Sequence, residues 1–148
     1  MQIEGEFNVT APQALVWENI RDPEIMAGCI PGCESIEQID ATSFRSVVAI
    51  KVGPISARFN LVVEITEEIA PETIRSRTKG EEGTRASILT SQNVLRLADD
   101  GSGGTDVAYA VDVTMTGRLG KYGLGIIRKK ADQLAGVFVE NFRKRVVP

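Results

Sequence analysis

The sequence opens with a strand pattern that recurs along most of the chain. In IEGEFNV, apolar and polar side chains alternate, so that Phe7 and Val9 share one face. From residue 34 to 118 the same alternation returns in SFRSVVAIKV, ARFNLVVEIT and VAYAVDVTMTG, with turn residues such as Gly53-Pro54 between the runs. Short strands joined by tight turns predict a meandering antiparallel sheet with one solvent-facing side.

Three segments carry helical signals instead. TAPQALVWENI offers Thr10 as an N-cap, and RDPEIMAGC offers Asp22 as a cap followed by Pro23 in the first turn. Residues 120–145 form the third segment, where apolar and small residues fall within a stripe of about 80° on a helix. The stripe consists of Gly120, Leu124, Ile127, Ala131, Leu134, Phe138 and Phe142. We expect it to lie on the apolar face of the sheet.

The order of elements predicts one α+β domain over residues 1–148, in which a curved antiparallel sheet wraps around the long C-terminal helix. Two short helices near the N-terminus complete this helix-grip arrangement. A curved sheet does not lie flush on a helix along its whole length, so a cavity is expected between them, although the pattern alone is more often that of a filled core. The predicted inward set is Phe44, Val48, Ile50, Phe59, Leu61, Tyr109, Val111, Val113, Ile127, Ala131, Leu134 and Phe138.

Further residues are candidates for the wall or mouth of such a cavity. Trp17 either packs on the sheet or lines the cavity wall. Met26, Ile30 and Pro31 belong to a loop expected at the mouth of the grip. The hydroxyl of Tyr109 is suited to hydrogen-bonding a ligand carbonyl, but a core tyrosine with a solvated tip would have the same pattern.

The residues that usually carry chemistry are sparse. The chain has no histidine, which excludes histidine-dependent nucleophilic catalysis and histidine metal sites. Cys29 and Cys33 supply too few ligands for zinc and lack the C-x-x-C spacing of a redox motif, so we expect neither metal nor redox chemistry there. The carboxylate pairs, Glu81-Glu82 among them, sit at turns or strand ends and are expected to be solvated. We therefore expect no catalytic residues and no required cofactor.

Charge is distributed unevenly along the chain. Residues 1–117 carry nine basic and eighteen acidic side chains, whereas residues 118–148 carry eight basic and two acidic ones. An acidic body argues against nucleic acid as a partner, while the basic segment suits an anionic membrane surface or an acidic protein. The candidate docking residues are Arg128, Lys129, Lys130, Arg143, Lys144 and Arg145. For the last three, a favourable interaction with the helix dipole is an alternative explanation.

Several stretches resemble a known family. DPEIMAGCIPGCESIE, VGPISARF, GGTDVAY and MTGRLGKYG together look like the G-subunit family of carbon monoxide dehydrogenase, which belongs to the START-like, helix-grip superfamily. The resemblance runs from Phe7 to Phe142. It implies a non-catalytic accessory protein of molybdenum hydroxylases, with quinone-like lipids bound in its cavity and association with the membrane. Members often carry a C-terminal extension credited with membrane contact, and this chain stops at Pro148.

Three functions are open, of which the first two are compatible with each other. The first is a carrier of an apolar small molecule such as a quinone, and the second is an assembly or anchoring protein that docks through the basic segment. The third is an enzyme of the polyketide cyclase or hydratase type, which the same superfamily hosts and which the lack of histidine disfavours. The absence of an export signal favours the cytoplasm, and membrane docking would place the protein at the inner face of the cell membrane.

Overall fold

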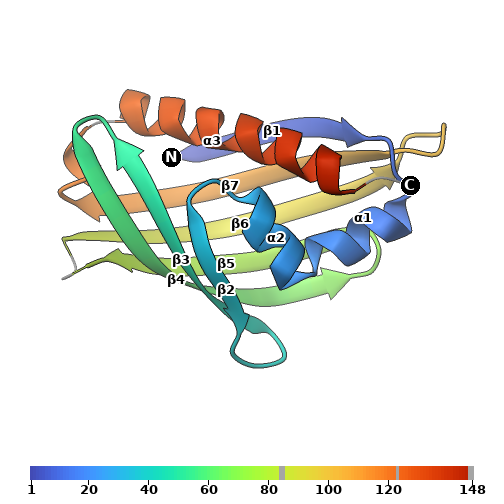
Figure 1. The fold of residues 1–148 in the computed structure, drawn as a ribbon, viewed down its shortest axis with the longest axis horizontal. Coiled ribbons are helices and arrows are strands. Elements are labelled where there is room, and N and C mark those ends of the chain that lie inside the picture. Colours follow the sequence, from blue (N-terminus) through green and yellow to red (C-terminus); the bar gives the residue numbers. More distant parts are fainter. Residues whose placement is uncertain (84–85, 123, 147–148) are drawn as a thin grey trace.

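One curved antiparallel sheet, with helices against its concave side, makes up the molecule (Figure 1). The structure is a computed structural model and describes residues 1–83, 86–122 and 124–146. In that part of the chain the elements are β1 (Gln2–Val9), α1 (Gln13–Ile20), α2 (Pro23–Cys29), β2 (Cys33–Gln38), β3 (Ser43–Val52), β4 (Ile55–Ile69), β5 (Thr73–Glu82), β6 (Ser87–Asp99), β7 (Thr105–Gly117), the 3₁₀ helix η1 (Gly120–Tyr122) and α3 (Leu124–Arg145).

The strand order explains how the sheet comes to enclose a space. It runs β1-β7-β6-β5-β4-β3-β2, so β1 and β2 lie at opposite edges although only α1 and α2 separate them in sequence. The chain must therefore cross from one edge of the sheet to the other, and the two helices close one end of the concave side (Figure 1). Register shifts in β2 and β4 interrupt the ladder, and such bulges increase the bend and twist of strands.

The two short helices start differently from each other. Asp22 caps α2 as predicted, because its carboxylate accepts the backbone N–H groups of Glu24 and Ile25. The prediction of Thr10 as the cap of α1 is wrong: Pro12 occupies the N-cap position and no side chain caps the helix. Gln13 instead donates its amide to the carbonyl oxygens of Pro71 and Leu97, tying α1 to the sheet.

The C-terminal helix is shorter than predicted. The sequence suggested a helix from residue 120, but Gly120–Tyr122 is a separate 3₁₀ turn and α3 begins at Leu124. Gly123, between the two, lies outside the described residues. At its other end α3 is firmly packed: Phe142 is fully buried, edge-on to Phe7 at 6.5 Å and stacked on Phe138 at 5.5 Å.

The predicted strand faces are confirmed by the register. Val48 of β3 lies opposite Phe59 of β4, and Leu97 of β6 lies opposite Val107 of β7, so that the apolar residues of neighbouring strands share the concave side. The convex side carries exposed polar and charged residues, with pairs such as Arg77–Glu64. The sheet therefore has one wet face, and the core lies between its other face and the helices.

Candidate ligand-binding site

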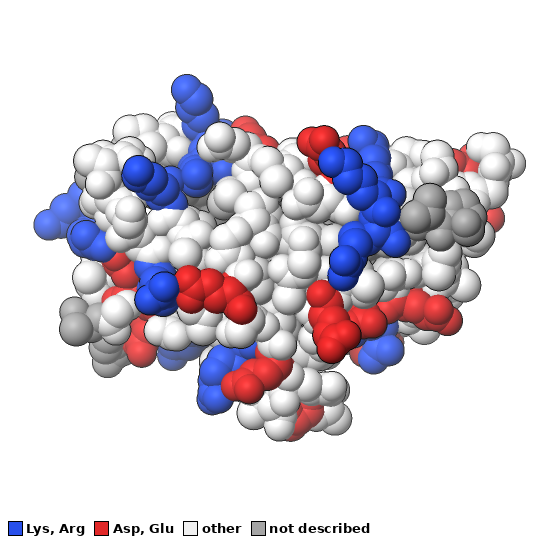
Figure 2. Space-filling model, viewed as in Figure 1, with Lys and Arg blue, Asp and Glu red and all other residues white. Residues whose placement is uncertain are grey.

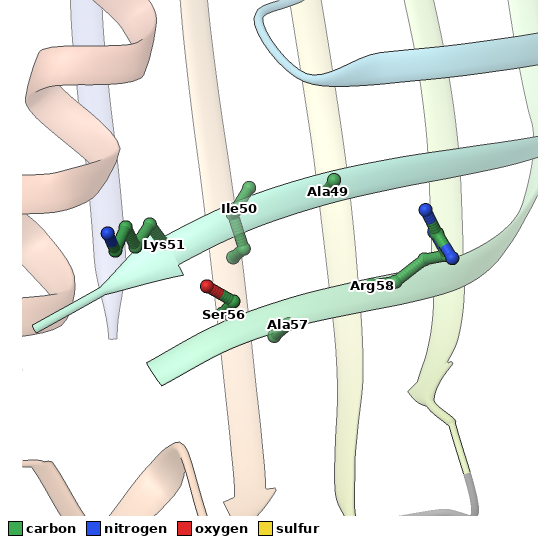
Figure 3. A pocket seen from close by; sticks show the side chains of 6 residues that line it. All are labelled: Ala49, Ile50, Lys51, Ser56, Ala57 and Arg58. Carbon is green, nitrogen blue, oxygen red and sulfur yellow. The ribbon is translucent and has the colours of Figure 1, made fainter. Parts of the chain in front are cut away.

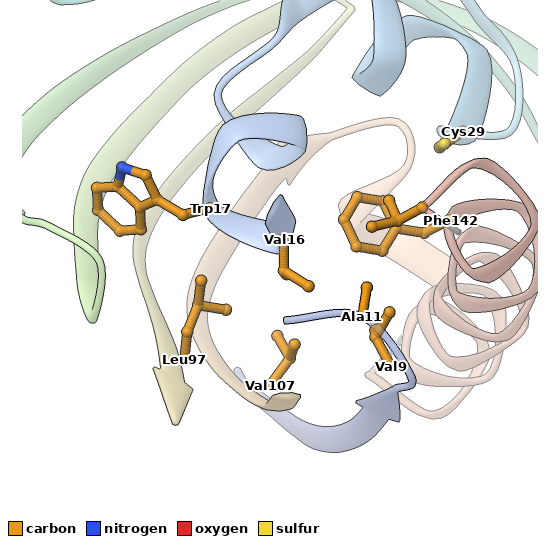
Figure 4. Packing of buried hydrophobic residues seen from close by; sticks show 9 residues of the cluster. Val9, Ala11, Val16, Trp17, Cys29, Leu97, Val107 and Phe142 are labelled. Atoms are coloured by element: carbon orange, nitrogen blue, oxygen red, sulfur yellow. The ribbon is translucent and has the colours of Figure 1, made fainter. Parts of the chain in front are cut away.

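The interior is closed at both ends by separate apolar clusters. The larger one, the helix-end cluster, joins α1, α2 and the end of α3 to the sheet; Figure 4 shows Val16, Ala11 and Phe142 converging in it. The smaller one, the hairpin-end cluster, packs around Phe59 and the fully buried Leu119, next to η1. Each end of the interior is thus sealed by well-buried side chains.

Between these clusters lies a middle section whose apolar side chains are only partly covered. Its members face the concave side or belong to α3, and none belongs to either buried cluster. They are Phe44, Val48, Val63, Ile65, Tyr109, Val111, Ile127, Ala131 and Leu134, and the buried Val113 lies among them on β7. These side chains mark the stretch of the concave side that the two clusters leave incompletely covered.

The structure divides the predicted inward set between core and middle section. Phe138 packs on the helix-end cluster, whereas Ile50, Phe59 and Leu61 belong to the hairpin-end cluster. Phe44, Val48, Tyr109, Val111, Val113, Ile127, Ala131 and Leu134 remain between the clusters. The predicted inward set is thus divided between side chains packed at the two ends and partly covered side chains between them.

The residues predicted to form the wall or mouth of the cavity also lie in two different places. Trp17 is buried in the helix-end cluster and Met26 packs against it, which matches the packing alternative for the tryptophan. Ile30 and Pro31 are partly buried in the turn that leads from α2 to β2. They follow directly after α2, beside the partly covered stretch of β3.

Tyr109 points into the concave side, as predicted. Gly5, its neighbour on β1, makes room for the ring: a Cβ at Gly5 would lie 2.2 Å from the tyrosine oxygen. The hydroxyl forms no hydrogen bond with the described residues. It is therefore available to a ligand or to water.

Sequence reasoning missed a polar row on the concave side of β5 and β6. The amide nitrogen of Asn93 donates to Ser76 Oγ at 3.2 Å and to Thr78 Oγ1 at 3.0 Å, while Ser91 Oγ donates to the Asn93 amide oxygen at 3.0 Å. Register places Thr78 opposite Val63 and Asn93 opposite Val111, inside the middle section. The alternating apolar strands gave the signal for that face, but polar residues in RSRT and TSQN hid its continuation.

Sequence reasoning was also wrong about Glu82. It was expected to be solvated, yet Glu82 points inward and is only 4% exposed. Its carboxylate accepts from Ser87 Oγ and pairs with the Arg118 guanidinium. These hydrogen bonds, with Arg118 first, hold the pKa of Glu82 below its usual value. The pair lies at the hairpin end, where Leu119 donates its N–H to Ser87, so it fastens the chain just before η1.

The two cysteines lie in different surroundings. Cys29 is buried in the helix-end cluster, and this burial raises the pKa of its thiol. Cys33 lies on β2 with its sulfur 3.7 Å from Ser46 Oγ. Gly32, in the turn before it, has φ +77°, and a Cβ there would lie 2.0 Å from the carbonyl oxygen of Ala49. The C-x₃-C stretch is therefore built around a tight turn against β3.

The six basic docking candidates form two groups on α3. Residues 128–130 and 143–145 are separated by roughly 20 Å along the helix, and Figure 2 shows basic side chains at separate places on this face. Arg128 donates to the carbonyl oxygen of Gln2, and Arg143 donates to that of Asn8. These two arginines fasten α3 to β1. Lys144 pairs with Glu140 on the exposed side of the helix.

Two shallow hollows lie outside the middle section. One, of about 430 Å³, is at the β3–β4 hairpin (Figure 3) and is lined by Ala49, Ile50, Lys51, Ser56, Ala57 and Arg58. The other, of about 260 Å³, is lined by Glu4, Gly5, Glu6, Val94, Arg96, Ala108, Tyr109 and Ala110. Most of these side chains point away from the concave side, so neither hollow coincides with the predicted cavity.

Metal-ligand clusters and membrane-spanning helices can be assessed for residues 1–83, 86–122 and 124–146. Among these residues, no group of three or more histidine, cysteine, aspartate or glutamate side chains is placed to hold a metal ion. None of their helices combines the length and apolar character needed to cross a membrane.

The sheet, the helix that lies across it and the partly filled interior define a START-like helix-grip protein, as predicted. The chain belongs to the carbon monoxide dehydrogenase G-subunit (CoxG) family, whose family model matches residues 5–147. No curated protein gave a significant match by sequence.

Solved structures agree on the fold. A conserved protein from Geobacillus kaustophilus is 20% identical with a TM-score of 0.91, covering 99% of this chain and 95% of its own. A START superfamily protein from Mycobacterium smegmatis is 13% identical with a TM-score of 0.76, covering 98% and 96%. An aromatase/cyclase from Streptomyces sp. R1128 is 14% identical with a TM-score of 0.72, covering 99% and 93%. At these identities the likeness concerns the fold alone.

Proposed function

We propose that this protein is a non-catalytic accessory protein of a molybdenum hydroxylase of the carbon monoxide dehydrogenase type. It binds a quinone-like or other apolar lipid between the concave sheet and α3, and it links the enzyme to the membrane. Membership of the CoxG family supports the association with such an enzyme.

One observation carries the ligand-binding part of the proposal: the apolar interior is sealed at both ends and left incompletely covered in the middle. Apolar surface that stays in contact with water costs about 25 cal/mol for each Å². Partly covered apolar side chains such as Val111 and Ile127 stand in this stretch, which suits a site that an apolar ligand covers.

The charged groups of the interior support a binding role over catalysis. Glu82 is held by Arg118 and Ser87, and its lowered pKa keeps it ionised, so it is a poor general acid. It also sits at the hairpin end, beside the covered Leu119 rather than in the middle section. The middle section offers hydroxyl and amide groups, which can orient a ligand without reacting with it.

Native mass spectrometry of the protein purified from its own host tests this function. We expect a one-to-one complex that releases a quinone-type lipid on collisional activation. A protein that is empty after purification, and that stays empty when incubated with an excess of isoprenoid quinone, would contradict the carrier role.

The partner is tested separately. We expect the immobilised protein to retain a purified molybdenum hydroxylase of the carbon monoxide dehydrogenase type, whereas a molybdenum hydroxylase of unrelated substrate class serves as the control. Equal retention of both enzymes, or of neither, would contradict the accessory role.

A further inference from the structure

The polar row on β5 and β6 crosses an otherwise apolar surface, and its own hydrogen bonds set its direction. We propose, on the basis of the function proposed above, that Ser76 and Thr78 donate hydrogen bonds to the bound molecule and that Asn93 orients them. The site would then take an apolar ligand that carries a hydrogen-bond acceptor such as a carbonyl oxygen. A pure hydrocarbon would lack the matching group.

Counting donors and acceptors leads to this assignment. Asn93 uses both hydrogens of its amide, one on Ser76 Oγ and one on Thr78 Oγ1, and its oxygen accepts from Ser91. A hydroxyl has one hydrogen to donate and two positions at which to accept. The hydroxyls of Ser76 and Thr78 accept from the amide and make no other hydrogen bond with the described residues. Their two O–H groups are therefore left to donate.

The apolar residues around Ser76 and Thr78 make an unpaired O–H group costly once water is displaced. Thr78 lies opposite Val63, and Ser76 lies opposite Ile65, all on the concave side. Ser91 is only 8% exposed, so the far side of the row is already dry. A donor without a partner in such surroundings costs more than an acceptor without one, because acceptors are more easily left unsatisfied. When an apolar ligand displaces water from the middle section, an acceptor on the ligand is needed to replace the water.

The row is not explained by the needs of the sheet. Valine has the shape of threonine and at least its preference for strands, so a valine at 78 would serve the sheet as well. Threonine on the other face has an ordinary explanation: Thr90 and Thr114 face each other on the convex side and are exposed to solvent. Thr78 instead lies opposite Val63 on the concave side, bonded to an amide that is itself held by Ser91.

A matched pair of probes tests the assignment. 2-Methyl-1,4-naphthoquinone and 2-methylnaphthalene share the same fused ring, and only the first carries carbonyl oxygens. We expect the wild-type protein to bind the quinone more tightly than the hydrocarbon. Thr78→Val and Ser76→Ala should each weaken quinone binding by roughly 3- to 10-fold, the range for one neutral hydrogen bond, and leave hydrocarbon binding unchanged. Thr90→Val, the same change on the convex side, should alter neither affinity, and thermal melts check that each variant folds.

The outcomes distinguish a failure of this hydrogen-bond assignment from a failure of the proposed ligand-binding function. If the protein binds both probes and the Thr78→Val and Ser76→Ala variants bind the quinone as tightly as wild type, the two hydroxyls do not bind the ligand, although a binding site exists. If Thr78→Val and Ser76→Ala weaken binding of the reduced quinol, which also donates, but leave quinone binding unchanged, the row acts as an acceptor and the assignment is reversed. If neither probe binds, the proposed ligand-binding function is wrong, and so is the role assigned to Ser76 and Thr78.

Discussion

At the residue scale, the buried polar side chains are what sequence reasoning could not find. In Glu81-Glu82 the two neighbours point to opposite faces of β5, and nothing in the pair says which one points inward. The inward one is set by pairing: Glu82 lies opposite Phe59 and Ser87. Its partner Arg118 follows the last residue of β7, 36 positions away, so their contact depends on the pairing of β5, β6 and β7.

The Glu82–Arg118 pair yields the first prediction. Glu82→Gln should lower the free energy of unfolding at pH 7 by about 1–3 kcal/mol, because it removes charge-assisted hydrogen bonds to Arg118. The folded-state pKa of Glu82 is lowered, so its contribution is present above the ordinary glutamate pKa and is lost as the pH falls through the lowered value. The gap between wild type and variant should therefore shrink below about pH 4.5. Chemical denaturation at several pH values measures it.

Glu6→Gln is the control for this pair, since Glu6 is an exposed glutamate on β1. It should change stability by less than about 0.5 kcal/mol, as is usual for surface substitutions. A gap for Glu82→Gln that is absent at neutral pH, or that widens in acid, would contradict the account.

At the element scale, strands were more predictable than helices. The alternation in SFRSVVAIKV predicted β3 at Ser43–Val52 with its apolar face correctly placed. In an antiparallel sheet with one solvent-facing side, apolar and polar residues alternate along each strand, so the sequence shows which residues face the core. The start of α3 was predicted too early, since Gly120 fits a helical stripe by spacing alone while the chain uses a 3₁₀ turn there. The surface that the α3 stripe faces depends on the curvature of the sheet. Bulges in β2 and β4 accompany this curvature, and no local sequence pattern predicts them.

Ala131 on α3 gives the second prediction. The residue is partly exposed within the middle section, so Ala131→Leu should be tolerated in thermal stability while it prevents uptake of a quinone analogue. In a packed core the same change would overfill the site and cost about 1–3 kcal/mol. Thermal melts with and without 2-methyl-1,4-naphthoquinone distinguish the two. Gln133→Leu, on the exposed side of α3, is the control and should leave uptake intact.

A strongly destabilised Ala131→Leu would point the other way, provided that the quinone also fails to raise the melting temperature of the wild type. That combination would describe a solid scaffold, and the carrier role would have to be abandoned.

At the scale of the whole molecule, the two faces of α3 differ in their surroundings and in their charge. One face looks toward the sheet, while the other is exposed and carries Lys129 and Lys144 together with the uncharged Ile126 and Val137. The unequal charge distribution was visible in the sequence. That Arg128 and Arg143 are used to fasten α3 to β1 was not visible, because it requires knowing that β1 pairs with the last strand.

The third prediction concerns membrane docking. Each lysine near an anionic membrane contributes up to about 1 kcal/mol, so Lys129→Ala with Lys144→Ala should reduce co-sedimentation with anionic liposomes, and added salt should weaken wild-type binding. Lys51→Ala with Lys79→Ala, on exposed sheet positions, is the control and should have no such effect. Binding that ignores lipid charge and salt would contradict electrostatic docking. A loss of stability with unchanged binding would leave Lys144 with the helix-dipole role alone.

The central claim is that an apolar ligand sits between the concave sheet and α3, and the position of the ligand can be measured directly. In methyl-labelled protein titrated with 2-methyl-1,4-naphthoquinone, we expect chemical-shift changes and intermolecular NOEs at Val48, Val111, Val113 and Ile127. The exposed Val62 and Val137 should stay unchanged and provide the internal control. Shifts confined to exposed methyl groups, or no shifts at saturating quinone, would contradict the claim.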